Sequence, residues 1–245
     1  MNIKLTIQYD GTNYHGYQIQ PNGITVQEVL QNTLKRITGE EINVVGCGRT
    51  DAGVHALGFV ANFNTNSKIA PQNFANALNA LLPNDIRTLK SELVSDEFHS
   101  KKSAIKKTYI YKIHNAPIGD AFLRNYTWHY KYPLDVKKMQ QAAKYFVGEH
   151  DFKAFVAAGF SAKTTVRKIF DLNVQKDGDI ITVSVTGNGF LYNMVRIITG
   201  TLVYVGGGKI NADDILEIIQ SCDRTRAGIT APPQGLFMKE VFYIE

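Results

Sequence analysis

Apolar and polar residues alternate in two ways along the first part of the chain, one with the period of a strand and one with the period of a helix. Residues 2–10 alternate with a period of two, which is typical of a half-buried strand. A helix is predicted between Thr25 and Gly39, because Thr25 and Glu28 form a capping-box pair and a glycine suits the helix end. The same patterns predict strands over 42–48, 58–65 and 86–94 and a helix from Pro71 to Pro83.

The rest of the chain repeats this order of elements. The clearest hairpin signal is Asp177-Gly178, because an Asp-Gly pair between two strand-like runs suits a tight turn. The predicted elements are, in order, a strand over 108–114, a helix capped by Asp135 and ended before Gly148, strands over 166–175 and 180–186, a helix over 190–204 closed by glycines 206–208, a short helix from Asn211 to Ile219 and a strand over 237–244.

Two successive βαββαβ runs predict an α+β protein built from two ferredoxin-like modules. We place the boundary near residue 105, so that residues 1–105 form an N-terminal module and residues 106–245 form a C-terminal module. In this interpretation the N-terminal module carries the glycine-rich loop described below, and the C-terminal module completes a cleft between the two. The alternative is a single α+β domain without internal repetition.

Composition and charge narrow the class of protein. The 245 residues are 44% hydrophobic and 20% charged, which is ordinary globular composition. The net charge of +5 favours anionic partners without naming one. The two cysteines, Cys47 and Cys222, lie far apart in the sequence, so they form neither a Cys-x-x-Cys pair nor the dense disulfide framework of a secreted protein. We therefore expect the protein to work in a reducing cytoplasm. The start of the chain lacks the apolar region of a signal peptide, and no stretch reaches roughly 18 unbroken apolar residues, so we expect a soluble protein without a membrane span.

A glycine-rich segment between the second and third predicted strands, Gly46–Ala56, carries an arginine and a carboxylate close together. Glycines let the backbone approach a ligand closely. Beside the guanidinium of Arg49, the carboxylate of Asp51 would stay ionised, as a nucleophile or a proton acceptor must. Arg49 could instead contact a phosphate or a base. The structural alternative for Asp51 is an Asx-turn in a glycine-rich connection.

Basic and aromatic residues interleave in three segments, and these are the side chains that pair with phosphates and stack on bases. For any one segment the alternative is a solvated basic face above core tyrosines. The segments are Phe98-His99-Ser100-Lys101-Lys102, Lys106-Lys107-Thr108-Tyr109-Ile110-Tyr111-Lys112 and Lys163-Thr164-Thr165-Val166-Arg167-Lys168.

Arg196 lies within an otherwise apolar helical pattern, where its charge needs a partner. The simplest explanation is a side chain that reaches solvent from the edge of the helix. If Arg196 pairs with a carboxylate instead, Asp51 is the natural candidate.

Taken together, these segments resemble those of the TruA-type tRNA pseudouridine synthases. The motifs GRTDAGVHA, FHS followed by KKTYIY, HDF, KTTVR, GFLYNMVR and TAPPQGL occur in the order of that family and span nearly the whole chain. The resemblance implies a bimodular pseudouridine synthase fold, a homodimer, and conversion of uridine to pseudouridine in the anticodon stem-loop of tRNA, at tRNA positions 38 to 40. It also implies that no cofactor or metal is used.

The resemblance also implies roles for particular residues. Asp51 falls on the catalytic aspartate of the family and Tyr109 on its active-site tyrosine. Arg49 matches an arginine that helps to hold the flipped-out base position, and Arg196 matches the basic partner of the aspartate. The residues that match tRNA-contacting segments are Phe98, His99, Ser100, Lys101, Lys102, Lys163, Thr164, Thr165, Val166 and Arg167.

This assignment suits the chemistry of isomerisation, in which the N-glycosidic bond breaks, the base turns and C5 bonds to the sugar. One carboxylate suffices, either to attack the sugar or the base or to take a proton from the sugar. A paired base must first leave its stem at a cost of roughly a few kcal/mol, which Arg49 could offset by filling the vacated space while Tyr109 stacks on the uracil. Two other classes stay open: a tRNA-binding or tRNA-folding module without turnover, and a nucleoside hydrolase that releases free base.

Overall fold

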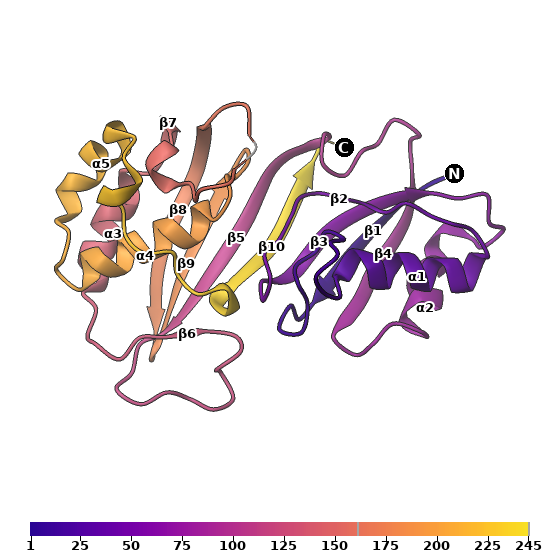
Figure 1. The fold of residues 1–245 in the computed structure, drawn as a ribbon, viewed down its shortest axis with the longest axis horizontal. Helices are drawn as coiled ribbons and strands as arrows, with labels where there is room; N and C mark the ends of the chain where they lie inside the picture. The colour runs from indigo at the N-terminus through magenta and orange to yellow at the C-terminus, as the bar shows by residue number, and fades with distance from the viewer. Residues whose placement is uncertain (161, 245) are drawn as a thin grey trace. The chain divides into compact units, whose positions relative to one another are not determined.

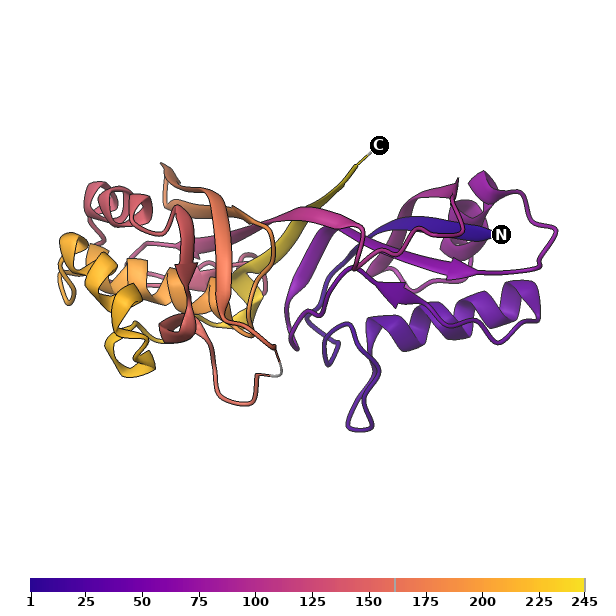
Figure 2. The ribbon, with the colours of Figure 1, turned by 90° about the horizontal axis from the view of Figure 1, so that it is seen from above.

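The structure, a computed structural model, describes residues 1–160 and 162–244. Ser161 and Glu245, which the expected C-terminal module includes, lie outside the described residues. The chain folds into two compact units, of which the first consists of Met1–Ile105 with the C-terminal segment from Phe237, and the second of Lys106–Leu236 (Figures 1 and 2). Each unit combines helices with paired strands, so the α+β class predicted from the sequence is confirmed.

The first unit is a sheet covered by helices. Its elements are β1 (Asn2–Tyr9), α1 (Val26–Thr38), β2 (Val45–Gly46), β3 (His55–Asn64), a 3-10 turn (Pro71–Asn73), α2 (Phe74–Asn79), β4 (Ile86–Val94) and β10 (Leu236–Tyr243). The strands β4, β1 and β3 lie side by side in that order and are antiparallel. On the other edge of β3, β2 pairs in the antiparallel sense and β10 in the parallel sense. The βαββαβ order predicted for this part of the chain is thus present.

The core of the first unit lies between the sheet and its helices. Alternation along β1 turns Ile3 and Ile7 toward one face, opposite Phe63 and Phe59 of β3, and all four side chains are buried. Helix α1 crosses the front of this sheet in Figure 1. The ring of Phe74, at the start of α2, meets the Phe63 ring edge-on with centroids 5.3 Å apart. The apolar side chains of β1, β3 and α2 therefore form this core.

Both ends of α1 form as the sequence predicts. The hydroxyl oxygen of Thr25 accepts a hydrogen bond from the Glu28 N–H at 3.4 Å, which caps the first turn. Gly39 takes the left-handed conformation, with φ +77°, and its N–H donates to the Lys35 carbonyl oxygen at 2.8 Å.

The strand predicted over 42–48 is much shorter in the structure, since only Val45–Gly46 pair with β3. The backbone of Val44 bonds to α1 instead. The Gln27 side-chain N–H donates to the Val44 carbonyl oxygen at 2.8 Å, and Gln31 Oε1 accepts from the Val44 N–H at 3.0 Å. Side-chain amides of the helix therefore take the place of a strand partner.

The last strand belongs to the first unit. The division expected from the sequence places this segment in the C-terminal module, whereas β10 pairs with the start of β3, with Phe237 opposite His55 and Met238 opposite Ala56. A period-two pattern predicts that a strand exists but does not specify its partner.

The second unit has its own set of strands. Its elements are β5 (Ala104–His114), β6 (Trp128–His129), α3 (Val136–Lys144), β7 (Gly148–Asp151), a 3-10 turn (Lys153–Phe155), β8 (Val166–Asp177), β9 (Ile180–Gly187), α4 (Met194–Gly206), α5 (Ile215–Ser221) and further 3-10 turns (Ala212–Asp214, Arg224–Arg226 and Pro233–Gly235). The strands run β5-β9-β8-β7 with antiparallel neighbours, and β6 adds to β5 in parallel. The predicted hairpin joins β8 to β9, where Gly178 has a φ of +54°.

Helix α4 begins four residues later than the sequence predicts. Asn193 is in the left-handed conformation, with φ +60°, and cannot continue a right-handed helix. The Met194 N–H donates to the Leu191 carbonyl oxygen at 3.1 Å, so the residues before α4 form a turn. The expected start at Phe190 is therefore wrong.

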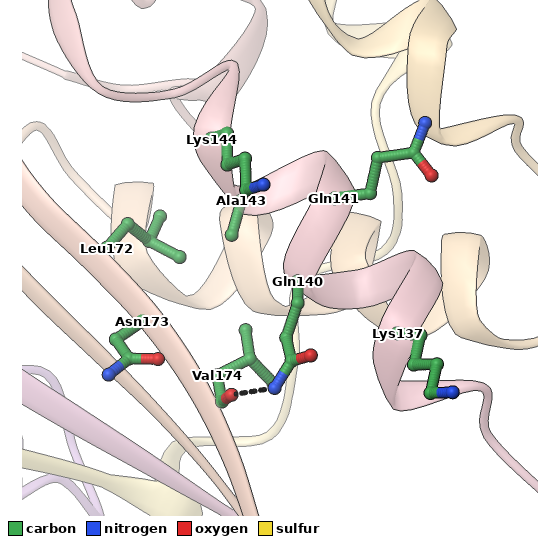
Figure 3. Close-up of a pocket in the computed structure, with 8 residues that line it drawn as sticks. All are labelled: Lys137, Gln140, Gln141, Ala143, Lys144, Leu172, Asn173 and Val174. Atoms are coloured by element: carbon green, nitrogen blue, oxygen red, sulfur yellow. Dashed lines mark hydrogen bonds between the residues drawn. The ribbon is translucent and has the colours of Figure 1, made fainter.

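A polar pocket lies at the surface of the second unit, where α3 runs beside β8 (Figure 3). The Gln140 side-chain N–H donates to the Val174 carbonyl oxygen across it at 2.8 Å. The pocket contains none of the residues that the sequence singled out for chemistry or RNA contact. Its lining residues are Lys137, Gln140, Gln141, Ala143, Lys144, Leu172, Asn173 and Val174. Over residues 1–160 and 162–244, no helix combines the length and the apolar character needed to cross a membrane.

Candidate active site

The loop that carries Asp51 joins β2 to β3 and is tied down at both ends. At its start, the Cys47 N–H donates to the Val60 carbonyl oxygen at 2.8 Å. At its end, the Val54 N–H donates to the Asp51 carbonyl oxygen at 3.1 Å, and Gly53 takes the positive φ of +76° that this turn requires. The main chain of Asp51 therefore closes this turn.

The loop between β1 and α1, which extends beyond α1 in Figure 2, holds the Asp51 loop by close backbone contact. A Cβ atom on Gly11 would lie 2.0 Å from the Val54 carbonyl oxygen, and one on Gly16 would lie 2.3 Å from the Thr50 carbonyl oxygen. The Tyr17 N–H donates to the same Thr50 oxygen at 3.2 Å. Only glycine fits at these two contacts, and they fix the backbone on either side of Asp51.

Exposure differs sharply between neighbouring residues of this loop. Thr50 and Val54 are buried, Asp51 is half-buried and Arg49 is exposed. A carboxylate on a fixed backbone that reaches the surface can act on a bound ligand as a nucleophile or a base. The exposed guanidinium of Arg49 can bind a phosphate or a base edge.

Two buried tyrosines line the inner side of this loop. Burial raises the pKa of Tyr9 and of Tyr17 well above the ordinary value of a phenol. The Tyr9 hydroxyl lies 2.8 Å from the Thr50 hydroxyl, and the Tyr17 ring stacks on Phe59 with centroids 4.2 Å apart. Both hydroxyls stay protonated at neutral pH, so these residues shape the loop and do not act as bases.

In the second unit, Arg196 lies in the first turn of α4 and is half-buried. A cation near a helix N-terminus interacts unfavourably with the helix dipole, at a cost of about 0.3–1 kcal/mol. The charge of Arg196 therefore needs stabilising partners. Arg196 Nε donates to the Ala231 carbonyl oxygen at 2.7 Å, and one Nη donates to Asn193 Oδ1 at 2.8 Å. The side chain is thus held by protein oxygens and does not simply extend into solvent.

The two tyrosines of β5 differ in their surroundings, although alternation puts them on one side of the strand. Tyr111 is fully buried, and its hydroxyl donates to the Pro232 carbonyl oxygen at 2.7 Å. Burial raises the pKa of Tyr111 well above its ordinary value, although the Arg196 guanidinium acts in the opposite direction. Tyr109 is 8% exposed and meets the Phe190 ring edge-on with centroids 5.1 Å apart. Both tyrosines are therefore buried, and Tyr109 differs only in a small exposed fraction of its surface.

Ser100 anchors the segment 98–102 within the first unit. Its side chain is fully buried, and its hydroxyl donates to the Val45 carbonyl oxygen at 2.7 Å. Its N–H donates to Asn62 Oδ1 at 2.9 Å, and its carbonyl oxygen accepts from the Tyr243 hydroxyl at 2.8 Å. These three hydrogen bonds fix the position of Ser100 in the segment.

The neighbours of Ser100 face outward to differing degrees. Phe98 is half-buried against the ring of Tyr243, with centroids 5.0 Å apart. His99 Nδ1 accepts from the Lys101 N–H at 3.2 Å, which turns the chain. Lys101 and Lys102 are exposed, so they are the charges that this turn presents to solvent.

The segment 163–167 leads into β8 in the second unit. Lys163 and Thr164 are exposed, as is Val166, whereas Thr165 is half-buried. The Arg167 guanidinium folds back and donates from one Nη to the carbonyl oxygens of Thr164 at 2.9 Å and of Val166 at 2.6 Å. Partial burial lowers the pKa of Arg167 from its ordinary value.

The structure brings part of the candidate site together within each unit. Asp51 and Arg49 share one loop of the first unit, and the segment 98–102 belongs to that unit as well. Tyr109, Arg196 and the segment 163–167 belong to the second unit. The pairing of Arg196 with Asp51 stays a prediction.

Three residues with a clear part in this arrangement were not singled out from the sequence for any role. They are Thr50, which is bonded to Tyr9, and Asn193 and Ala231, which hold Arg196. All three lie inside the motifs GRTDAGVHA, GFLYNMVR and TAPPQGL, so the motifs located them without indicating what they contact.

Comparison with known proteins defines the class. The tRNA pseudouridine synthase family matches residues 5–101 and 142–244. A tRNA pseudouridine synthase A of Thermoanaerobacter sp. (strain X514) is 52% identical over 242 residues, which cover 99% of each chain. A protein of the same name from Ruminiclostridium cellulolyticum is 53% identical over 98% of this chain and 99% of its own length. In a solved structure of a Cbf5-Nop10-Gar1 complex, one chain aligns with 98% of this chain at 15% identity and a TM-score of 0.45, and this chain spans half of its length. The chain belongs to the tRNA pseudouridine synthase family.

Proposed function

We propose that this protein isomerises uridine to pseudouridine in tRNA and that the carboxylate of Asp51 is the catalytic group. The observation that carries the proposal is the position of Asp51, which is half-buried on a loop fixed by Thr50 and Val54 in a chain that is 52% identical to a tRNA pseudouridine synthase A. A carboxylate in a constrained position suits a reaction that needs one nucleophile or one proton acceptor.

The reaction needs no exchange of atoms with another molecule. The N-glycosidic bond breaks, the uracil turns, and a new bond joins its C5 to the sugar. Asp51 attacks the sugar or the base, or it takes a proton from the sugar, and each route uses the same ionised carboxylate. In this proposal Arg196 is the source of positive charge in the reaction.

The substrate we propose is a uridine at position 38, 39 or 40, in the anticodon stem-loop of tRNA. A stem base must leave its pair before it reacts. Arg49 is exposed in the same loop as Asp51. In this proposal Arg49 enters the vacated space, and the ring of Tyr109 stacks on the uracil. The exposed Lys101, Lys102 and Lys163 supply charge for the phosphates.

We further propose that the enzyme is a cytoplasmic homodimer. Both cysteines carry thiols, which suits a reducing compartment. The loop between β5 and β6 displays Ile118 with 82% of its surface exposed and Phe122 with 87% exposed. The carboxylate of Asp120 accepts hydrogen bonds from the N–H groups of Phe122 and Leu123, which turn the backbone of this loop. Large apolar side chains that gather at the surface are typical of a protein interface.

The test is incubation of the protein with an unmodified tRNA transcript, followed by digestion and nucleoside analysis by mass spectrometry. We expect a uridine isomer of unchanged mass, mapped to positions 38 to 40 by chemical labelling specific for pseudouridine. A transcript with cytidine at these three positions is the matched control. Release of free uracil would indicate a hydrolase, and binding without any isomer would indicate a tRNA-binding module.

A further inference from the structure

The segment Gly228–Pro232 is anchored to the second unit at nearly every residue. The Gly228 N–H donates to the buried Thr201 hydroxyl oxygen of α4 at 2.8 Å. Arg224 donates to the Gly228 carbonyl oxygen at 2.9 Å, and the Tyr111 hydroxyl donates to the Pro232 carbonyl oxygen at 2.7 Å. The segment therefore has a defined position on the surface of α4.

Two glycines allow the segment to approach α4 this closely. A Cβ atom on Gly200 would lie 1.9 Å from the Ile229 carbonyl oxygen. A Cβ atom on Gly228 would lie 2.5 Å from the Thr201 backbone nitrogen. The backbones of helix and segment are thus in direct contact, and their distance is set without intervening side chains.

The anchored segment holds Arg196 through Ala231. The Ala231 N–H donates to the Arg196 carbonyl oxygen at 3.1 Å, and Arg196 Nε donates back to the Ala231 carbonyl oxygen at 2.7 Å. On the other side, an Nη of Arg196 donates to Asn193 Oδ1 at 2.8 Å. Bonds at Nε and Nη fix the plane of a guanidinium, because its donors form a rigid fork.

We propose that Thr201, through the segment Gly228–Pro232, is a positioning residue for Arg196 in catalysis. The inference rests on the proposed function, in which Arg196 supplies positive charge at the reacting centre. Loss of the Thr201 hydroxyl leaves the Gly228 N–H without its acceptor and loosens the segment. The Ala231 carbonyl oxygen then sets the direction of the guanidinium less precisely, and small misplacements of a catalytic group slow chemistry more than binding.

The test compares three variants that differ in one group each. Thr201→Val keeps the shape but removes the hydroxyl, and Thr201→Ser keeps the hydroxyl but removes the methyl. Thr199→Val is the matched control, because Thr199 is equally buried in α4. Both hydroxyls also donate within the helix, Thr199 to the Val195 carbonyl oxygen at 2.9 Å and Thr201 to the Ile197 carbonyl oxygen at 2.8 Å. The measurements are kcat and KM for pseudouridine formation in a tRNA transcript, with a thermal melt of each variant.

We expect Thr201→Val to lower kcat about 10- to 100-fold with KM changed less than about twofold, and we expect Thr201→Ser and Thr199→Val to keep most of the wild-type kcat. A wild-type kcat in Thr201→Val overturns the inference. Equal losses in Thr201→Val and Thr201→Ser, or in Thr201→Val and Thr199→Val, also overturn it, because they show a packing role.

Arg196→Lys gives a second test that does not disturb the buried helix face. Lysine keeps the charge but lacks the Nε–H that bonds to Ala231. We expect it to be nearly as slow as Arg196→Ala, and a wild-type rate would overturn the inference by showing that charge alone suffices. If the wild-type protein itself forms no pseudouridine, the proposed function fails and this inference fails with it. Normal wild-type turnover with an unaffected Thr201→Val overturns only the inference.

Discussion

The hydroxyl of Tyr9 lies 2.8 Å from the hydroxyl of Thr50, and both side chains are buried. Tyr9 ends the first strand of the chain, and Thr50 immediately precedes Asp51. The contact therefore ties the loop that carries the candidate catalytic carboxylate to the central sheet of its unit. The backbone of Thr50 is held as well, since its carbonyl oxygen accepts from the Tyr17 N–H.

Thr50→Val should destabilise the protein and slow the reaction. The change keeps the shape of residue 50 but leaves the buried Tyr9 hydroxyl without its partner, which should lower the free energy of unfolding by about 1–3 kcal/mol. Denaturant unfolding and single-turnover rates measure the two effects. Thr50→Ser, which keeps the hydroxyl, is the control, and unchanged stability in Thr50→Val would show that the contact has no energetic weight.

Asp51→Asn should abolish pseudouridine formation while tRNA affinity changes by less than about twofold, because the carboxylate makes and breaks bonds but holds no phosphate. Filter binding and nucleoside analysis measure the two quantities on the same preparation. Asp171→Asn, which removes an exposed carboxylate from β8, should behave as wild type. Substantial turnover by Asp51→Asn would rule out this residue as the catalytic group.

Tyr109→Leu should slow isomerisation about tenfold or more, and Tyr109→Phe should retain much more activity. The reason is that stacking of a base on an aromatic ring contributes roughly 1–3 kcal/mol, and phenylalanine keeps the ring. Circular dichroism and thermal melts must accompany the rates, because Tyr109 also packs against Phe190 and its loss can disturb the fold. Equal collapse of both variants would indicate a role for the hydroxyl, and equal activity would indicate none for the side chain.

Binding of tRNA should weaken steeply with salt, with a logarithmic slope of about −0.7 to −0.9 for each phosphate contacted. Replacing Lys101, Lys102 and Arg167 by alanine should lower affinity and make the slope shallower. The control with the same change in charge replaces three exposed lysines of α3, and its slope should stay near wild type. These lysines are Lys137, Lys138 and Lys144. A slope that falls equally in both triple variants would mean that net charge alone governs binding.

The wild-type protein should sediment as a dimer at micromolar concentration, and serine at Ile118 and Phe122 should convert it to a folded monomer. Both side chains face solvent within one subunit, so their loss costs the fold little but removes apolar contact area from an interface. Leu93→Ser, at an exposed apolar position of β4, is the control. A wild-type protein that is only monomeric would contradict the proposed homodimer.

Local sequence pattern was sufficient for most elements of the fold. The caps of α1 at Thr25 and Gly39 and the turn at Gly178 depend on contacts between residues close in the chain. In one place where the prediction failed, a group from another element replaced the local one. The strand expected over 42–48 shortened because glutamines of α1 bond the backbone of Val44.

The sequence predicted which residues belong to the candidate site, but it did not predict the contacts that position them. The sequence by itself determined that Asp51 and Arg49 share a glycine-rich loop, because glycine is the residue that permits tight turns and close contacts. Tertiary structure alone decided that Gly16 meets the backbone of Thr50, that β10 pairs with β3, and that Ala231 holds Arg196. These contacts join residues far apart in the chain, and their geometry comes from the packing of whole elements, which the spacing of apolar residues within one element does not specify.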